Sequence, residues 1–428
     1  MSLYNQELHL GWSLNRQGLP YPLSPVTLLE SGTRFHTAML AQSGSGKSFA
    51  LGRFIEELAL KTASRVLILD PNSDFIRISE IEQAAWEGDL KEWMASENTP
   101  EEFQREWGKI PVHVASNWRK DAISLHSLAA EVSPIALSWE ALDLADKALF
   151  LGISRDRDLA EAYALRVAVE ELNSQYGRDM AGGLVHFVDY LEDTCIPSGY
   201  RPGVSERAEE YGHLLYERAR RLLQLHIWLT SPGAIVTETA RNMVTKGNPR
   251  ILVTDLGSLP SAEERSNVLC ALLKTLMHEA REQKQAAIGA ATDNRKALFI
   301  VIDEAHNIAP PQTSSTRVAR VVDLLVEIAS EGRKYGLFLV VASQRPSAVH
   351  PAILSQCDNL FLLRVSSRND IEAVANSFGY LPIEDARAAA SFRVGDALLA
   401  GRFVSSPTFA HIAPRRTAEG GRNLPSST

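Results

Sequence analysis

Residues 41–48 read Ala-Gln-Ser-Gly-Ser-Gly-Lys-Ser, and this stretch decides the fold class. It matches the phosphate-binding pattern G-x-x-x-x-G-K-[ST], with Ala41 in place of the leading glycine. Residues 35–40 before it read as a short strand, and residues 49–60 after it read as an amphipathic helix. This order of strand, loop and helix is the setting that the pattern requires. A simple Gly/Ser turn between strand and helix would not need Lys47 followed by a serine.

In this setting the loop predicts ATP binding. The backbone N–H groups of residues 43–48 would converge on the phosphates at a helix N-terminus, where the helix dipole favours anions. Lys47 would reach the β/γ-phosphate oxygens, and Ser48 would offer its hydroxyl to Mg²⁺, which prefers hard oxygen ligands. The residues predicted to bind the nucleotide are Ala41, Gln42, Ser43, Gly44, Ser45, Gly46, Lys47, Ser48 and Phe49.

A second motif lies at residues 298–306, which read Leu-Phe-Ile-Val-Ile-Asp-Glu-Ala-His. Its apolar run leads directly into Asp303 and Glu304, as in a strand buried on both faces of a sheet. Because ligands bind at the C-terminal ends of parallel strands, we expect Asp303 to hold Mg²⁺ together with Ser48. Glu304 is the predicted catalytic residue that faces the attacking water. The alternative is an acidic strand cap, which is less common with two adjacent carboxylates.

The tetrapeptide Asp303-Glu-Ala-His306 also occurs in DEAH-box RNA helicases. Those proteins carry both motifs in one compact half-domain, whereas residues 48–302, 255 in number, separate Lys47 from Asp303 here. No Ser-Ala-Thr motif follows either. This class is therefore excluded, and His306 is interpreted as incidental or as a coupling residue.

Residues 330–347 read Ser-Glu-Gly-Arg-Lys-Tyr-Gly-Leu-Phe-Leu-Val-Val-Ala-Ser-Gln-Arg-Pro-Ser. This segment resembles the HerA/FtsK family of hexameric motor ATPases, and HerA-like proteins in particular. The resemblance implies that Gln344 senses the γ-phosphate or its water. It also implies that Arg333 is an arginine finger offered to a neighbouring subunit, with Arg345 as the second candidate. The alternatives are that Gln344 only satisfies backbone groups and that Arg333 only complements a helix dipole.

The resemblance implies an α/β fold, a RecA/HerA-like P-loop NTPase whose central, mainly parallel sheet is flanked by helices. Further strands ending in Asp70 and Asp255 fit this design. The predicted domains are an ATPase core at 1–80 and 245–414, a mainly helical insertion at 81–244 and a disordered Gly/Ser/Pro-rich tail at 415–428.

The net charge of −8 argues against a broad nucleic-acid-binding surface. A ring, however, needs only a few positive side chains in its pore. Residues 284–296 and 309–317 read as mobile loops that would face such a pore. The candidate DNA contacts in or beside these loops are Lys284, Arg295, Lys296, Arg317 and Arg320, although a solvated surface explains them equally well.

The three cysteines are odd in number and lack metal-ligand spacing, which indicates a reducing compartment. No apolar run is long enough to span a bilayer, and the N-terminus lacks a signal-peptide pattern. We therefore expect a cytoplasmic protein with no membrane segment of its own. Only 40 residues precede the loop, so we also expect no β-barrel domain of the kind that HerA proteins carry there.

The resulting prediction is an ATP-hydrolysing, homo-oligomeric ring motor, a hexamer by resemblance. It would translocate duplex DNA through its pore, working with a nuclease or another effector in DNA processing or anti-phage defence. Two alternatives stay open. The ring could be an ATP-gated scaffold that activates an effector without translocation, or a secretion or conjugation ATPase.

Overall fold

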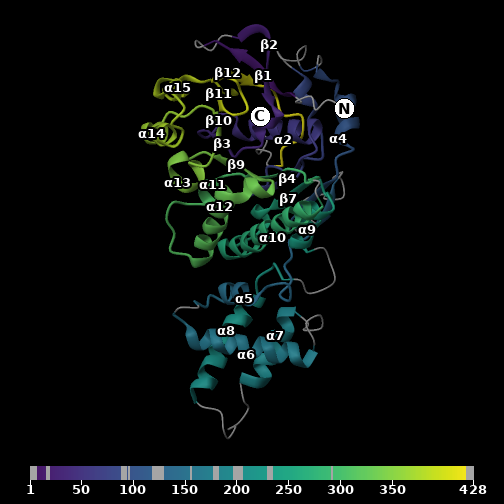
Figure 1. The fold of residues 1–428 in the computed structure, drawn as a ribbon, viewed down its shortest axis with the longest axis vertical. Helices are drawn as coiled ribbons and strands as arrows, with labels where there is room; N and C mark the ends of the chain where they lie inside the picture. The colour runs from purple at the N-terminus through teal and green to yellow at the C-terminus, as the bar shows by residue number, and fades with distance from the viewer. Residues whose placement is uncertain are drawn as a thin grey trace, which may run out of the picture.

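The computed structural model describes residues 7–15, 20–87, 94, 97–117, 130–154, 157–176, 183–195, 206–228, 235–290 and 293–420. Its strands form one mostly parallel, twelve-stranded sheet flanked by helices, which confirms the predicted fold class (Figure 1). In spatial order the strands are β2 (Pro20–Leu29), β1 (Glu7–Leu14), β12 (Thr408–Ile412), β11 (Asp396–Gly401), β10 (Asn359–Leu362), β3 (Thr37–Leu40), β9 (Leu337–Ser343), β8 (Leu298–Ile302), β4 (Arg65–Asp70), β7 (Ile251–Asp255), β5 (Val112–Ala115) and β6 (Glu131–Ser133).

The direction of the strands determines where the functional residues meet. All neighbours from β10 to β6 pair in parallel, whereas β2, β1, β12 and β11 pair antiparallel and extend one side of the sheet. The C-terminal ends of the parallel strands therefore lie at one edge. In an open α/β sheet, that edge is where ligands bind.

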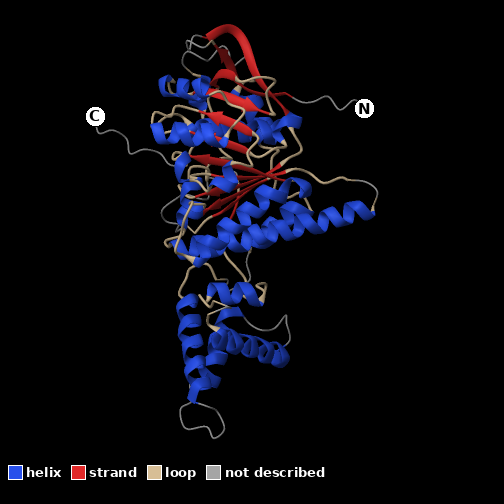
Figure 2. Cartoon of the chain, turned by 60° about the vertical axis from the view of Figure 1, so that its left-hand side comes forward, coloured by secondary structure: helices blue, strands red, loops and turns tan. Residues whose placement is uncertain are grey.

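Both faces of the sheet are covered, as the continuous apolar strands require. Along β8, Phe299 and Val301 pack on one face and Leu298, Ile300 and Ile302 on the other. The first face is covered by α2 (Lys47–Lys61) and α4 (Pro100–Trp107). The second face is covered by helices that also pack against one another (Figure 2): α9 (Val236–Thr245), α10 (Ala262–Gly289) and α12 (Thr316–Tyr335).

Shorter helices connect the strands and complete the core. They are α1 (Glu30–Thr33), α11 (Ala305–Ile308), α13 (Pro351–Leu354), α14 (Arg368–Ser377) and α15 (Ile383–Ala388). A separate helical layer projects beyond α10 and α12 (Figure 1). It contains α5 (Leu144–Phe150), α6 (Leu159–Tyr176), α7 (Gly183–Cys195) and α8 (Glu206–Leu223).

The predicted boundaries of the helical insertion, 81–244, were too wide. Within that range, β5 and β6 extend the central parallel sheet, α4 packs on the same face as α2, and α9 packs against α10. Only α5 to α8 form the projecting helical layer. The two strands were missed because three or four residues are too few to show a period, and neither sequence, Val-His-Val-Ala or Glu-Val-Ser, is a continuous apolar run.

The predicted loop at 284–296 was also wrong in its first half. Helix α10 continues to Gly289, so Lys284 belongs to its last turns. Alanine is the strongest helix former, and residues 286–287 are an alanine pair that prolongs the helix. On the other side of β8, α12 begins at Thr316, one residue before Arg317.

The start of the predicted disordered tail is ordered. Arg415 and Arg416 are each 2% exposed. Arg416 donates to the carboxylates of Glu56 and Glu57 on α2, at 3.1 and 2.6 Å, and Arg415 stacks over Phe75. The Gly/Ser/Pro composition suggested disorder, but Arg416 finds buried carboxylate partners on the P-loop helix, and Arg415 is held by Phe75 and by the carbonyl of Ala418. Residues 421–428 lie outside the described residues.

Two further expectations concern cysteines and membranes. Cys270 and Cys357 are free, buried thiols, and the side chain of Cys195 lies outside the described part. Burial raises the pKa of the Cys270 thiol to about 12, which makes this thiol unreactive. None of the helices in the described ranges combines the length and the apolar character needed to cross a membrane.

Candidate ATP site

The predicted phosphate-binding loop joins the end of β3 to the start of α2 at Lys47. Gly46 has φ +93°, a conformation that favours glycine. A Cβ atom on Gly46 would also lie 3.3 Å from the backbone nitrogen of Gly395. Gly395 donates its N–H to the carbonyl of Ser45 at 3.2 Å. The loop therefore needs glycine at position 46 both for its own turn and for its contact with the start of β11.

The neighbouring strands hold the beginning of the loop. The N–H of Ala41 donates to Ser343 O at the end of β9, at 3.1 Å. The N–H of Gln42 donates to Arg364 O beyond β10, at 2.7 Å. The side-chain oxygen of Gln42 also accepts from the hydroxyl of Ser366, at 2.6 Å. Ala41 is fully buried, so the side chain at this position must be small.

Lys47 joins the two predicted halves of the site. Its ammonium group donates to Asp303 and lies 3.1 Å from Oε1 of Glu304, and all three side chains are buried. Burial alone lowers the pKa of Lys47, but the two carboxylates outweigh it and the net shift is upward. Lys47 is therefore a fixed positive charge between the loop and the acidic strand.

The acidic pair follows β8 through a sharp turn. Glu304 has φ +45° and precedes the short helix α11, and its N–H donates to Oδ1 of Asp303 at 2.9 Å. A non-glycine residue in this conformation is strained, and such strain clusters at functional sites. Two buried oxygens here, Oδ2 of Asp303 and Oε2 of Glu304, accept no hydrogen bond within the described structure. Buried, unsatisfied acceptors of this kind are what a ligand, water or ion would pair with.

Gln344 reaches the site from the end of β9. Its side-chain nitrogen donates to Oε1 of Glu304, so the predicted sensor contacts the predicted catalytic carboxylate. His306 lies on the other side of Glu304, with Nδ1 3.3 Å from Oε2 and 3.2 Å from Oγ of Ser343. Burial lowers the pKa of His306, so the ring is neutral at pH 7. Two residues that follow neighbouring strands, Gln344 after β9 and His306 after β8, thus lie on either side of one carboxylate.

Sequence reasoning missed Asp74. The hydroxyl of Ser48 lies 3.3 Å from Oδ2 of Asp74, which places a third carboxylate beside the loop. Asp70 turns the chain back at this point, because its carboxylate accepts the backbone N–H groups of Asn72, Asp74 and Phe75. The signal was present in the sequence as Asp-Pro-Asn-Ser-Asp, since Asp, Asn and Pro favour such turns.

The carboxyl groups of Asp70 and Asp74 in this turn should make the stability of the protein depend on pH. Burial, reinforced by nearby carboxylates, raises the pKa of Asp70 to about 8, and burial and Asp303 raise that of Asp74 to about 6. The native state therefore binds more protons than the unfolded state from about pH 4 to 8. We expect the free energy of unfolding of the nucleotide-free protein to fall as the pH rises through this range. Urea denaturation at several pH values measures it, and Asp74→Asn should flatten the part below pH 6.

The residues present fit a divalent cation. Ser48 lies in the first turn of α2, Asp303 follows β8, and Asp303 has a buried oxygen without a partner. A hydroxyl and a carboxylate are ligands of the kind that Mg²⁺ takes beside phosphate groups. Ser48 and Asp303 would therefore hold Mg²⁺ together with the nucleotide.

Two predicted residues do not join this cluster. Phe49 follows Ser48 but its side chain is 50% exposed. Arg333 lies at the opposite edge of the sheet, where it pairs with Asp358 at 2.9 Å and stacks over Phe35 at 4.1 Å. The seven-residue strand β9 separates Arg333 from Gln344, a span of about 20 Å. Arg333 therefore cannot reach the site of its own chain. Arg345, the second candidate, is exposed beside Gln344.

Comparison with known proteins agrees with this geometry. A family model described as "Helicase HerA, central domain" matches residues 8–276, which is more than half of the chain. The chain belongs to the HerA helicase family. It is thus a P-loop ATPase of the HerA/FtsK type, and a model of the AAA family of ATPases matches residues 234–365.

Two relatives match different shares of this HerA-family chain. The DNA double-strand break repair helicase HerA of Pyrococcus furiosus is 24% identical over 88% of the chain and 65% of its own length. A probable helicase of Methanocaldococcus jannaschii is 30% identical over 33% of the chain and 27% of its own length. The chain therefore spans less than two thirds of either relative.

Solved structures show the same fold as this HerA-family chain. VirB4 of Thermoanaerobacter pseudethanolicus superposes with a TM-score of 0.53 and 17% identity, covering 95% of the chain and 96% of VirB4. The plasmid coupling protein TrwB, bound to a non-hydrolysable ATP analogue, superposes with a TM-score of 0.52 and 13% identity. That superposition covers 99% of the chain and 98% of TrwB.

Proposed function

We propose that this HerA-family chain hydrolyses ATP as a subunit of a ring and uses the energy to translocate duplex DNA, alongside a nuclease or another effector. One observation carries the hydrolysis: Lys47 of the loop, Asp303 and Glu304 after β8, and Gln344 after β9 form one buried, connected cluster. Nucleotide binding alone does not need a second buried carboxylate held by a glutamine.

The chain's own residues would divide the chemistry as follows. The N–H groups of the loop and Lys47 bind the phosphates and neutralise their charge. Glu304 accepts a proton from the attacking water or orients it, and Gln344 keeps the carboxylate in place. Ser48 and Asp303 would hold Mg²⁺, which would help to neutralise the charge of the phosphates.

A variant of Gln344 tests its role. We expect Gln344→Ala to lower turnover by about 10²-fold, because the carboxylate of Glu304 loses the hydrogen bond that the side chain of Gln344 donates. ATP affinity should change little, since the loop and Lys47 are intact. Single-turnover hydrolysis with bound ATP separates the two effects. A loss of affinity with unchanged turnover would contradict this assignment.

The position of Arg333 supports the proposed ring. At the opposite edge of the sheet, this guanidinium would face the nucleotide only of a neighbouring copy. A head-to-tail arrangement brings one copy's edge with Arg333 against the next copy's edge with Glu304, and such an arrangement closes into a ring. The same proposal includes a hexameric ring, a cytoplasmic location, an effector partner and a role in anti-phage defence.

Of the candidate DNA contacts, Lys296 and Arg320 are exposed and make no ion pair with a described carboxylate. Arg317 instead pairs with Glu263 at 2.9 Å and donates to Phe150 O, and Arg295 pairs with Asp293. The exposed segment 310–315, at the same edge as Glu304, is the remaining candidate for a pore loop.

The test is steady-state ATPase activity with and without linear duplex DNA, at low and moderate salt, with the mass in solution measured on the same samples. Stimulation by DNA in a ring-sized species supports the translocase. ATPase activity that does not change with DNA favours the ATP-gated scaffold or the secretion or conjugation ATPase. The absence of ATPase activity in the ring-sized species contradicts the proposal.

A further inference from the structure

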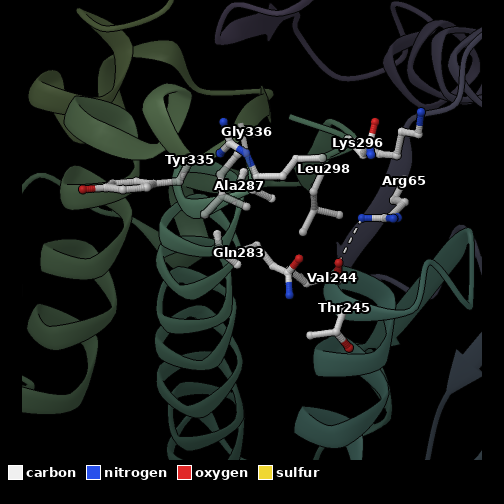
Figure 3. A pocket seen from close by; sticks show the side chains of 15 residues that line it. Arg65, Val244, Thr245, Gln283, Ala287, Lys296, Leu298, Tyr335 and Gly336 are labelled. Atoms are coloured by element: carbon white, nitrogen blue, oxygen red, sulfur yellow. Dashed lines mark hydrogen bonds between the residues drawn. The ribbon is translucent and has the colours of Figure 1, made fainter. Parts of the chain in front are cut away.

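A polar cavity of about 350 Å³ lies at the edge of the sheet opposite the ATP site. It is bounded by the starts of β4, β8 and β9, by α9 and α10, and by the end of α12 (Figure 3). Its wall contains small alanine side chains from α10, and Gln283 and Thr245 add polar groups. Nothing in the ATP-binding function described above uses this cavity.

The charges in this cavity are all positive. Arg65, Arg295 and Lys296 line it, and none of the described residues that line it carries a carboxylate. Arg295 is held in place by Asp293, which accepts from Nε at 2.8 Å and from Nη2 at 2.7 Å. Lys296 is exposed at the rim and pairs with no carboxylate in the described ranges. This cavity is therefore lined by one cation that is paired with a carboxylate, Arg295, and by two that have no described carboxylate partner, Arg65 and Lys296.

The surroundings of Arg65 show the excess of positive charge most clearly. Its Nη1 donates to Val244 O at 3.1 Å and so caps the end of α9, as Figure 3 shows. Burial lowers the pKa of Arg65, and the neighbouring Arg250 lowers it further. Among the described residues, Arg250 donates to the backbone carbonyls of Ala59, Thr62 and Ser64. Two half-buried guanidinium groups without a described carboxylate partner make this edge a site of unbalanced positive charge.

We propose that this cavity binds a phosphate group. Guanidinium and ammonium groups are the side chains that recognise phosphate, and the cavity is large enough for a phosphate with part of a sugar. The phosphate can come from a DNA backbone or from a free phosphate compound. With DNA as the source, the inference rests on the proposed function and adds a backbone contact to it.

Two variants test the site without disturbing the core. Lys296→Ala removes an exposed cation, and Ala287→Glu places a carboxylate in the wall at a helical position that tolerates glutamate. Arg387→Ala, an exposed cation on α15, is the matched control. Binding of a fluorescein-labelled DNA duplex is measured by anisotropy over a range of salt. Binding of inorganic pyrophosphate is measured by calorimetry in a Lys47→Ala background, which weakens the phosphate-binding loop.

Both variants are expected to lower affinity by about tenfold in at least one of these measurements, and Arg387→Ala in neither. If DNA is the source, Lys296→Ala should also reduce the slope of log affinity against log salt by about one. If the wild type binds no DNA but pyrophosphate binding depends on Lys296, the site stands while the translocase fails. If DNA binds and stimulates the ATPase while neither variant changes either probe, the site is overturned and the translocase stands.

Discussion

Glu304→Gln is expected to bind ATP at least as tightly as the wild type and to lose about 10³-fold in turnover, since the substitution removes the proposed general base. Affinity is retained because Lys47 and the loop are intact. Glu304 also repels the phosphates, so its neutralisation should favour binding. Binding of a fluorescent ATP analogue and phosphate release at steady state measure the two quantities.

Two controls belong to this prediction. Glu372→Gln neutralises an exposed carboxylate on α14 and should leave both quantities unchanged. Lys47→Ala should weaken binding as well as turnover, because the phosphates lose their ammonium partner. Equal turnover by the wild type and Glu304→Gln would remove Glu304 from the mechanism.

Arg333→Ala is expected to lower turnover by roughly 10³- to 10⁵-fold, the range that an arginine finger contributes. The reason is geometric: Arg333 lies about 20 Å from Gln344 along β9, so it would act on the nucleotide of the next copy. Mixing Arg333→Ala with Lys47→Ala tests this directly. Arg333→Ala keeps an intact Lys47, and Lys47→Ala keeps an intact Arg333. Activity therefore returns in the mixture only if each site is shared between copies.

The neighbour of Arg333 provides the control for a purely structural role. Asp358→Asn breaks the 2.9 Å ion pair but keeps the guanidinium. An exposed pair of this kind contributes little to stability, so Asp358→Asn should keep most of the activity. Equal losses in Arg333→Ala and Asp358→Asn, or no recovery in the mixture, would show that Arg333 acts only within its own chain.

The parallel core was predictable from sequence because its strands carry strong signals. The run 298–302 is apolar throughout and ends in two acids, and the loop at 41–48 has a defined pattern. The strands β5 and β6 were missed since three or four residues show no period. The ordered segment around Arg416 was missed because its stability comes from Glu56 and Glu57, which lie some 360 residues earlier.

The candidate site, like the fold, was predicted from the sequence only in part. Sequence placed Lys47, Asp303, Glu304 and Gln344 near the nucleotide, and the structure brings them into contact. Their catalytic roles stay predictions. Asp74 was missed because the sequence indicates a turn after Asp70 but not which side chain of that turn lies beside Ser48. The cavity beside Arg65 was likewise missed, since it joins residues from six elements.

We propose that ATP is hydrolysed at a site shared between copies of this chain. The most direct test measures ATPase activity per chain against protein concentration, with the mass in solution recorded at every point. Activity per chain is expected to rise from near zero as a ring-sized species forms and then to stay constant. Full activity in a monomer, independent of concentration, would contradict it.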